Sequence, residues 1–470
     1  MSRVDHLSWP EGVGTGAVPL VAATDLLPAA TTRTLPRHEV RVRTRLTTWP
    51  RGDLIIDACP IVGLAADGAL ATFAYGSKEH ALIAPVKDGR LAVAISDDSQ
   101  AWDDGHFLQL VAVASSESSV DRSDFKVGLL GYGAIGAEHA RAILSTAGLA
   151  LAAVCDPKPE RIAAAREIAP DVRAHHTADE LLNDPSVDIV IISTPPDSHA
   201  HWALRTLEQG RHVIVEKPMA LTTRECDDIL TTAADRNLLA AVYQNRRFDP
   251  DFRLIAESVR AGQIGEAFHL EAFVGGYGHP CNYWHSDAQV SGGALFDWGS
   301  HVIDQVLALF DGEVEGVTAL NHKRVWHDTT NADHARMTLH FDGGREATFI
   351  YSDLAAALKP RWYVLGTHGA ITGDWRQESV ITRSAIGTLD EDILAAADSP
   401  PIIRRHSPDG DVTTLVARPA EPHPFHADMA LRLRYGFAPR VRGIESRRVV
   451  AMLEAAEESA RLGGLPVKPA

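Results

Sequence analysis

Cysteine is scarce in this sequence, and no two cysteines form a C-x-x-C pair. The chain of 470 residues has four cysteines, and they lie far apart, at positions 59, 155, 226 and 281. A disulfide framework or a zinc knuckle needs closely spaced cysteines, so neither is expected. We expect reduced, mostly buried thiols, which are typical of a protein from a reducing compartment.

Excess positive charge and long apolar runs are also lacking. Lysine and arginine total 45 against 62 aspartates and glutamates, which gives a formal charge of −17 at pH 7. This charge repels polyanions and no basic run offsets it, so no nucleic-acid partner is expected. No apolar run approaches the roughly 20 residues that span a bilayer, and the N-terminus lacks the apolar core of a signal peptide. The sequence predicts a soluble, cytoplasmic protein with no membrane partner.

The first 124 residues divide into three parts. Residues 1–37 are rich in Pro, Ala, Thr and Gly and show little periodicity, so we expect an irregular segment. Residues 38–114 hold short runs in which apolar and polar residues alternate, with Asp-Gly turns before or between them. This pattern predicts a β-rich accessory domain. Residues 115–124, SSESSVDRSD, are typical of a polar linker.

The rest of the chain has two further patterns. In residues 125–247, short continuous apolar strands alternate with helical stretches, which predicts a parallel, doubly wound sheet. In residues 248–470 a helix leads to several strands with hairpin turns, and the chain ends in an amphipathic helix. This second pattern predicts a mainly antiparallel sheet. The expected fold class is therefore α/β, preceded by a β-rich domain.

A glycine-rich segment follows the first strand of the doubly wound region and opens a helix. It has G-x-G-x-x-G spacing and consists of Gly131, Tyr132, Gly133, Ala134, Ile135 and Gly136. The first glycine permits a tight turn, the second lets a pyrophosphate approach, and the third lets helix and strand pack closely. A βαβ turn without a ligand is the alternative. The context favours a Rossmann domain that binds a dinucleotide.

Asp156 lies 20 residues after the last glycine, at the end of the second strand. A carboxylate there can accept hydrogen bonds from an adenosine ribose and repels a 2′-phosphate, which favours NAD over NADP. Lys158 and Arg161 are close enough to weaken that preference.

The stretch SGGALFDWGSH, residues 291–301, places Asp297 and His301 four positions apart, on one face of a predicted helix. They can form a catalytic pair, or they can be an ordinary cap or solvated charge and an interior histidine. A third alternative is a metal site that adds Asp304, but further ligands with recognisable spacing are lacking, so no metal is expected.

Three segments in this order resemble the Gfo/Idh/MocA oxidoreductases, named after glucose–fructose oxidoreductase and inositol dehydrogenase. They are STPPDSHAHWA at 193–203, VIVEKPMA at 213–220 and SGGALFDWGSH. The resemblance runs from about Phe125 to the C-terminus. It implies a Rossmann domain beside an α/β domain whose open sheet often supports oligomers, so a homodimer or homotetramer is expected.

The resemblance also implies roles for individual residues. Lys217 of the E-K-P motif is expected beside the nicotinamide, with Asp297 and His301 in catalytic or substrate-contact roles. We expect His301 to be the general base and Lys217 to polarise the substrate oxygen. Further cofactor contacts are expected from Thr194, Pro195, His199, Glu216 and Asn245. Many members have W-R before the two glycines, whereas this chain has Trp284 and His285.

Other substrate contacts are predicted from residue type. Tyr283 and Trp284 can form a wall for a sugar ring, although core packing is the alternative. Arg247 can contact substrate, or it can pair with an acidic group, as can Arg246.

The resulting expectation is an NAD(P)-dependent dehydrogenase that acts on a sugar, an inositol or a related polyol. A redox-assisted glycosidase or lyase with tightly bound NAD needs the same residues. A nucleotide-sensing scaffold needs only the glycine segment, so the retention of Lys217, Asp297 and His301 argues against it. The pattern of residues 1–124 indicates no function.

Overall fold

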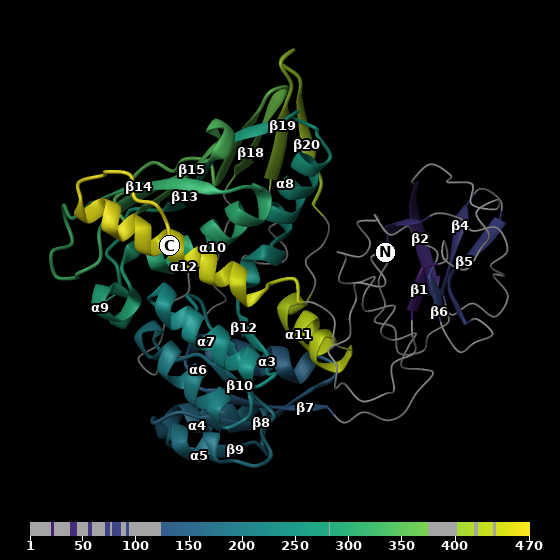
Figure 1. Cartoon of the computed structure of the whole chain (residues 1–470), viewed down its shortest axis with the longest axis vertical. Coiled ribbons are helices and arrows are strands. Elements are labelled where there is room, and N and C mark those ends of the chain that lie inside the picture. The colour runs from purple at the N-terminus through teal and green to yellow at the C-terminus, as the bar shows by residue number, and fades with distance from the viewer. Residues whose placement is uncertain are drawn as a thin grey trace. The chain divides into compact units, whose positions relative to one another are not determined.

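The structure of the protein is a computed structural model. It describes residues 124–281, 283–374, 402–417, 422–435 and 439–470, together with strands between residues 20 and 93 (Figure 1). The chain divides into two compact units. One contains Met1–Asp124 and His426–Arg440, and the other contains Phe125–Phe425 and Val441–Ala470.

In the first unit, the described strands form one sheet in the order β1-β6-β5-β4-β2-β3. They are β1 (Leu20–Ala22), β2 (His38–Thr44), β3 (Ile55–Ala58), β4 (Ala71–Tyr75), β5 (Lys78–Pro85) and β6 (Leu91–Val93). β1 lies within the segment that was expected to be irregular. The last part of the predicted β-rich domain and almost all of the predicted linker lie outside the described residues, so the β-rich domain stays a prediction.

The second unit begins with a parallel sheet in the order β12-β11-β10-β7-β8-β9. Its strands are β7 (Phe125–Leu130), β8 (Leu149–Cys155), β9 (Arg173–His175), β10 (Ile189–Ile192), β11 (His212–Val215) and β12 (Ala240–Val242). Its helices include α3 (Ala134–Ser145), α4 (Pro159–Ile168), α5 (Ala178–Leu182), α6 (His199–Glu208) and α7 (Thr223–Asp235). All four residues of β10 are buried, as expected for a strand covered on both faces. The Rossmann topology is confirmed.

A mixed sheet in the order β14-β15-β16-β13-β17-β18-β19-β20 follows. Its strands are β13 (Ala267–Gly275), β14 (Val314–His322), β15 (His334–Phe341), β16 (Glu346–Ser352), β17 (Trp362–Gly366), β18 (Gly369–Asp374), β19 (Ile402–His406) and β20 (Val412–Leu415). Among these strands the β13–β16 pair is parallel and the others are antiparallel. The predicted mainly antiparallel sheet is therefore confirmed.

Helices cover one face of the mixed sheet. They are α8 (Pro250–Arg260), α10 (Ala294–Leu309) and α12 (Gly443–Arg461). In the chain, α9 (Ala288–Ser291) precedes α10, and α11 (Pro424–Tyr435) precedes α12. α12 packs on β14, and α10 packs on α12 and β16 (Figure 1). The sides of α10 and α12 that lie in the core carry apolar residues such as Val302, Ile303 and Val449. Among the described residues, no helix combines the length and the apolar character that a membrane crossing requires.

Three segments of the second unit contribute residues to the candidate site. The glycine segment follows β7, the E-K-P motif follows β11, and Asp297 lies in the first turn of α10. The carboxyl ends of parallel strands lie along one edge of their sheet, so the first two segments are brought to the same edge. α10 starts after Gly292 and Gly293, whose φ angles of 85° and 103° are accessible to glycine and strained for other residues.

Candidate active site

The glycine segment has the backbone geometry that its spacing predicts. Gly131 has a φ of 94°. A Cβ atom on Gly136 would lie 2.3 Å from the carbonyl oxygen of Gly131, so only glycine lets α3 pack this close to the turn. A Cβ atom on Gly133 would meet no atom within 4 Å, which leaves open space where a ligand can approach the backbone.

Two further observations fit a bound dinucleotide. The N-terminus of α3 has no side-chain cap, so its backbone N–H groups are available to a phosphate. In the segment after β12, the Oδ1 atom of Asn245 is buried and has no hydrogen-bond partner among the described residues. Of the predicted segment, Tyr132, Ala134 and Gly136 are buried, and Ile135 is partly exposed. Any contact from the buried residues has to come from the backbone.

Asp156 is more enclosed than the sequence suggests. Its side chain accepts hydrogen bonds from the backbone N–H groups of Tyr132 and Lys158, both at 2.9 Å. The guanidinium of Arg161 lies 3.1 Å from Asp156 Oδ2. With only 1% of Asp156 exposed, the carboxylate ties the glycine segment to the start of α4.

His199 has a different role from the predicted cofactor contact. The residue is fully buried, and its two ring nitrogens each lie 2.8 Å from a carbonyl oxygen, Nδ1 from Pro218 and Nε2 from Thr194. No surface remains for a cofactor. His199 instead holds the segment after β10, which contains Thr194 and Pro195, against the E-K-P motif. The hydroxyl group of Thr194 lies 2.7 Å from that of Ser198.

Glu216 is held by a histidine that the sequence interpretation missed. His139 lies on α3, is 1% exposed, and places Nε2 2.9 Å from Glu216 Oε1. The backbone N–H of Lys217 donates to the other carboxylate oxygen of Glu216 at 3.1 Å. No spacing rule links His139 to Glu216, 77 residues away, so only the fold could reveal this contact.

Lys217 and Asp297 form the central contact of the site. The ammonium nitrogen of Lys217 lies 2.6 Å from Asp297 Oδ1 and 3.2 Å from the backbone oxygen of Asp297. Their side chains are 18% and 36% exposed, so both remain accessible to a small molecule. The pair joins the Rossmann domain to α10.

His301 lies one turn further along α10 and is buried. Burial is the main reason that the pKa of His301 lies well below its usual range. The positive charges of Lys217, Arg246 and Arg361 lower the pKa further. The ring stands edge-on to Trp298 at 5.9 Å, and Nδ1 has no hydrogen-bond partner among the described residues. At neutral pH His301 is therefore an uncharged imidazole that can accept a proton.

Arg247 corrects a prediction, because its guanidinium is already used. Its Nε atom donates to Asp304 Oδ2 at 2.9 Å, Nη2 also contacts Asp304, and Nη1 donates to Glu445 at 2.6 Å. Asp304 is 1% exposed. Arg247 therefore ties η3 (Asn245–Phe248) to α10 and α12, and the predicted substrate contact is not supported. Asp304 is an ion-pair residue.

The predicted aromatic wall consists of three neighbouring rings. Trp284 stacks on His285 with ring centroids 3.5 Å apart, and Tyr283 meets His285 edge-on at 4.8 Å. Tyr283 is 38% exposed. His285, at the position where the resemblance implies an arginine, thus contacts both aromatic side chains. Arg246 lies over the ring of Trp298 at 4.8 Å and pairs with Asp249.

Two residues near Asp297 had no sequence signal. The hydroxyl of Tyr351 donates to Asp353 Oδ1 at 2.8 Å, and both residues stand at the end of β16. The charge of Asp297 contributes to raising the pKa of each. α10 packs on β16, and a Cβ atom on Gly299 would lie 3.3 Å from the ring of Phe349, two residues before Tyr351. The strand that leads into the Tyr351–Asp353 pair therefore borders the helix that carries Asp297.

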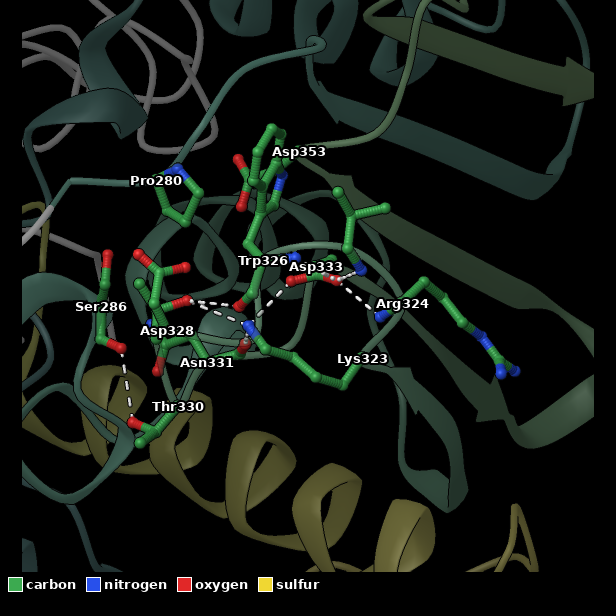
Figure 2. A network of polar contacts seen from close by, with 12 residues as sticks. Pro280, Ser286, Lys323, Arg324, Trp326, Asp328, Thr330, Asn331, Asp333 and Asp353 are labelled. Atoms are coloured by element: carbon green, nitrogen blue, oxygen red, sulfur yellow. Dashed lines mark hydrogen bonds and ion pairs between the residues drawn. The ribbon is translucent and has the colours of Figure 1, made fainter.

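A rigid loop, residues 323–333 between β14 and β15, borders this pair (Figure 2). Asp333 is fully buried and accepts from Lys323 Nζ at 2.8 Å and from the backbone of Arg324 and Val325. These bonds hold the pKa of Asp333 far below its usual range, against the opposing effect of burial. The backbone N–H of Asp353 donates to the carbonyl of Asp333 at 2.8 Å, which joins loop and strand.

Comparison with known protein families identifies the family of this chain. Residues 125–244 match the Gfo/Idh/MocA domain described as "Oxidoreductase family, NAD-binding Rossmann fold". Residues 252–372 match the GFO/IDH/MocA C-terminal domain. The chain belongs to the Gfo/Idh/MocA oxidoreductase family. A nicotinamide cofactor follows from this membership.

Several known proteins are similar to this chain over different lengths. The scyllo-inositol 2-dehydrogenase (NADP(+)) IolW of Bacillus subtilis is 27% identical over 344 residues, 72% of this chain and 94% of that protein. A glycosyl hydrolase family 109 protein of Shewanella pealeana is 34% identical over 156 residues, 31% of this chain and 34% of that protein. A solved NAD-binding protein from Listeria innocua has a TM-score of 0.63 at 28% identity, covering 74% of this chain and 97% of that structure.

A pair of glycine variants tests the dinucleotide site. Gly133→Ala places a methyl group in open space, so stability to urea should be unchanged while dinucleotide affinity falls by at least about tenfold. Gly136→Ala clashes with the Gly131 backbone and should lower the free energy of unfolding by roughly 1–3 kcal/mol. Fluorescence titration with NAD and with NADH gives the affinities. Unchanged affinity in a stable Gly133→Ala protein would place the phosphates elsewhere.

Arg247→Met tests the structural role of this arginine. Removing the guanidinium leaves the buried Asp304 without its partner, and broken buried ion pairs cost about 3–5 kcal/mol. We expect that loss in urea unfolding at neutral pH, with an unchanged KM under conditions where the protein stays folded. A normal unfolding curve with a raised KM would restore Arg247 as a substrate contact.

Proposed function

We propose that this protein is an NAD-dependent dehydrogenase of a sugar, an inositol or a related polyol. The observation that carries the proposal is the 2.6 Å contact between Lys217 Nζ and Asp297 Oδ1, with the neutral, buried His301 one helical turn away. An inositol dehydrogenase that is similar over most of its length supports the substrate class. A homo-oligomer and a small-molecule carbohydrate partner stay part of the same proposal.

In the proposed reaction, His301, Lys217 and Asp297 have separate roles. Bound nicotinamide supplies an acceptor for the hydride that leaves the carbinol carbon. His301 accepts the hydroxyl proton, since its ring is uncharged at neutral pH. The Lys217 ammonium stabilises the negative charge that develops on the oxygen. Asp297 holds that ammonium in place, and in the reverse direction His301 returns the proton.

Three variants test these roles. His301→Ala should lower kcat by roughly 10² to 10⁴, with little change in NAD affinity because the glycine segment is separate from α10. Lys217→Ala should cost about 3 kcal/mol of transition-state stabilisation. Asp297→Asn keeps the shape and should cost less than either. Because the pKa of His301 is lowered, its neutral form persists as the pH falls, so kcat should decline only well below pH ~6.5, the ordinary histidine pKa.

Stopped-flow and steady-state rates with saturating NAD separate the outcomes. Wild-type turnover in His301→Ala would remove His301 from the mechanism and leave Lys217 as the proton acceptor. A kcat that falls already near the ordinary histidine pKa would contradict the uncharged, buried imidazole.

We further propose that NAD is preferred over NADP. Asp156 directly follows β8, at the position where this fold usually places an acidic residue for the adenosine ribose, and it keeps the Arg161 guanidinium in an ion pair. The similar dehydrogenase IolW is named as NADP-dependent, so the preference of this protein for NAD needs a direct test.

Asp156→Ser tests the cofactor preference. The change removes the negative charge and releases Arg161, so affinity for NADP should rise by about tenfold or more while affinity for NAD falls. Calorimetric titration of wild type and variant with both dinucleotides measures this exchange. Tighter binding of NADP than NAD by the wild-type protein would overturn the proposed preference.

A redox-neutral glycosidase or lyase is the second candidate, favoured by the similarity to the family 109 protein. The two functions differ in stoichiometry. Incubation with NAD and a panel of polyols and aryl glycosides should give one NADH per oxidised polyol for a dehydrogenase. Release of the aryl group without accumulating NADH would favour the glycosidase instead.

A further inference from the structure

The Tyr351–Asp353 pair has no part in the chemistry assigned above, although it stands at the end of β16, the strand that packs on the catalytic helix α10. The backbone of Asp353 is fixed on two sides, because its N–H donates to the carbonyl of Asp333 and its carbonyl accepts from Gly278 at 3.2 Å. The side chain is partly exposed, and Tyr351 is the one side chain that hydrogen-bonds to it among the described residues. A carboxylate has room for about four hydrogen bonds, so Asp353 keeps unused acceptor capacity.

The surroundings of Asp353 come from three elements. α10 contributes Asp297, and the loop after β14 contributes Lys323 and Asp333. β16 itself contributes Tyr351. Since Asp297 binds Lys217, the remaining charge at this side of the site is negative unless Asp353 is protonated. A ligand that donates hydrogen bonds is therefore favoured here over one that carries negative charge.

We propose that Asp353, positioned by Tyr351, is a substrate-binding carboxylate. Asp353 accepts a hydrogen bond from a hydroxyl group next to the one that is oxidised. The inference rests on the proposed function and narrows it. The substrate is a ring polyol with at least two hydroxyl groups on adjacent carbons, one held by Lys217 and one by Asp353. A simple secondary alcohol lacks the second group and is bound weakly.

The pH behaviour of Asp353 gives this role a signature. Burial, with the charges of Asp333 and Asp297, raises its pKa to about 6, against the lowering effects of the Tyr351 hydrogen bond and Lys323. The ionised form is the stronger acceptor, so affinity for the polyol is present above that pKa and falls as the pH drops through about 6. The kcat profile, governed by His301, declines at lower pH.

Asp353→Asn tests the proposal directly. With the fastest substrate among scyllo-inositol, myo-inositol and D-glucose, KM should rise by roughly tenfold or more while kcat changes little. An analogue of that substrate without the neighbouring hydroxyl should show the same weak KM in wild type and variant. Asp328→Asn is the matched control, because Asp328 lies on the adjoining loop, pairs with the exposed His279, and should leave KM unchanged.

Tyr351→Phe tests whether Tyr351 positions Asp353 or has only a structural role. The change removes the hydrogen bond that lowers the pKa of Asp353, so the acid limb of KM should move to higher pH. A purely structural role would lower activity at every pH without moving the limb. An unchanged KM in Asp353→Asn, or equal losses for the full substrate and the analogue, would overturn the inference.

Calorimetric binding of scyllo-inositol to the NADH-loaded protein makes the same comparison without turnover. If no panel member forms NADH but scyllo-inositol binds tenfold more weakly to Asp353→Asn, the proposed function fails and the binding site stands. If NADH forms and the variant binds like wild type, the proposed function stands and the site fails. Absence of any polyol binding would reject the site.

Discussion

The ion pair between Lys217 and Asp297 is the contact on which the site depends. One partner follows the fifth strand of the parallel sheet in chain order, and the other lies in the first turn of α10, 80 residues later. The pair keeps the ammonium in one position and offsets its charge, while both side chains stay accessible. Without it, an unpaired lysine would stand beside the imidazole of His301, whose pKa its charge already lowers. The short contact therefore links cofactor domain, catalytic helix and proton acceptor.

The surrounding residues fix the two partners rather than react. His199 connects the segments after β10 and β11. Glu216 anchors the backbone of Lys217 and is itself held by His139. On the other side, Arg247 fixes α10 through Asp304. These contacts are buried or partly buried, so they are strengthened by low local polarity and are costly to break. This support explains how two partly exposed side chains can keep one geometry.

Much of the fold followed from local pattern, because continuous apolar strands, glycine spacing and hairpin turns act over a few residues. The motif residues Lys217, Asp297 and His301 were likewise recognised, and the structure brings them together. Contacts between residues that lie far apart in the sequence could not be predicted. Arg247 and Asp304 are 57 residues apart, and His139 and Glu216 are 77 apart. Whether an arginine binds a buried carboxylate or a substrate depends on which residues the fold brings next to it. The periodicity of the sequence does not reveal those residues. Asp353 was missed for the same reason.

Transfer of deuterium tests the central claim most directly. scyllo-Inositol deuterated at its ring carbons, incubated with the protein and NAD, should give NADH with one deuterium at C4 of the nicotinamide, accumulating in proportion to oxidised polyol. The Lys217→Ala protein should give the same labelled position at a greatly reduced rate, since only the stabilisation of the oxygen is lost. Deuterium that never appears in NADH, although the polyol is bound or converted, would contradict the account of Lys217, Asp297 and His301 as a dehydrogenase site.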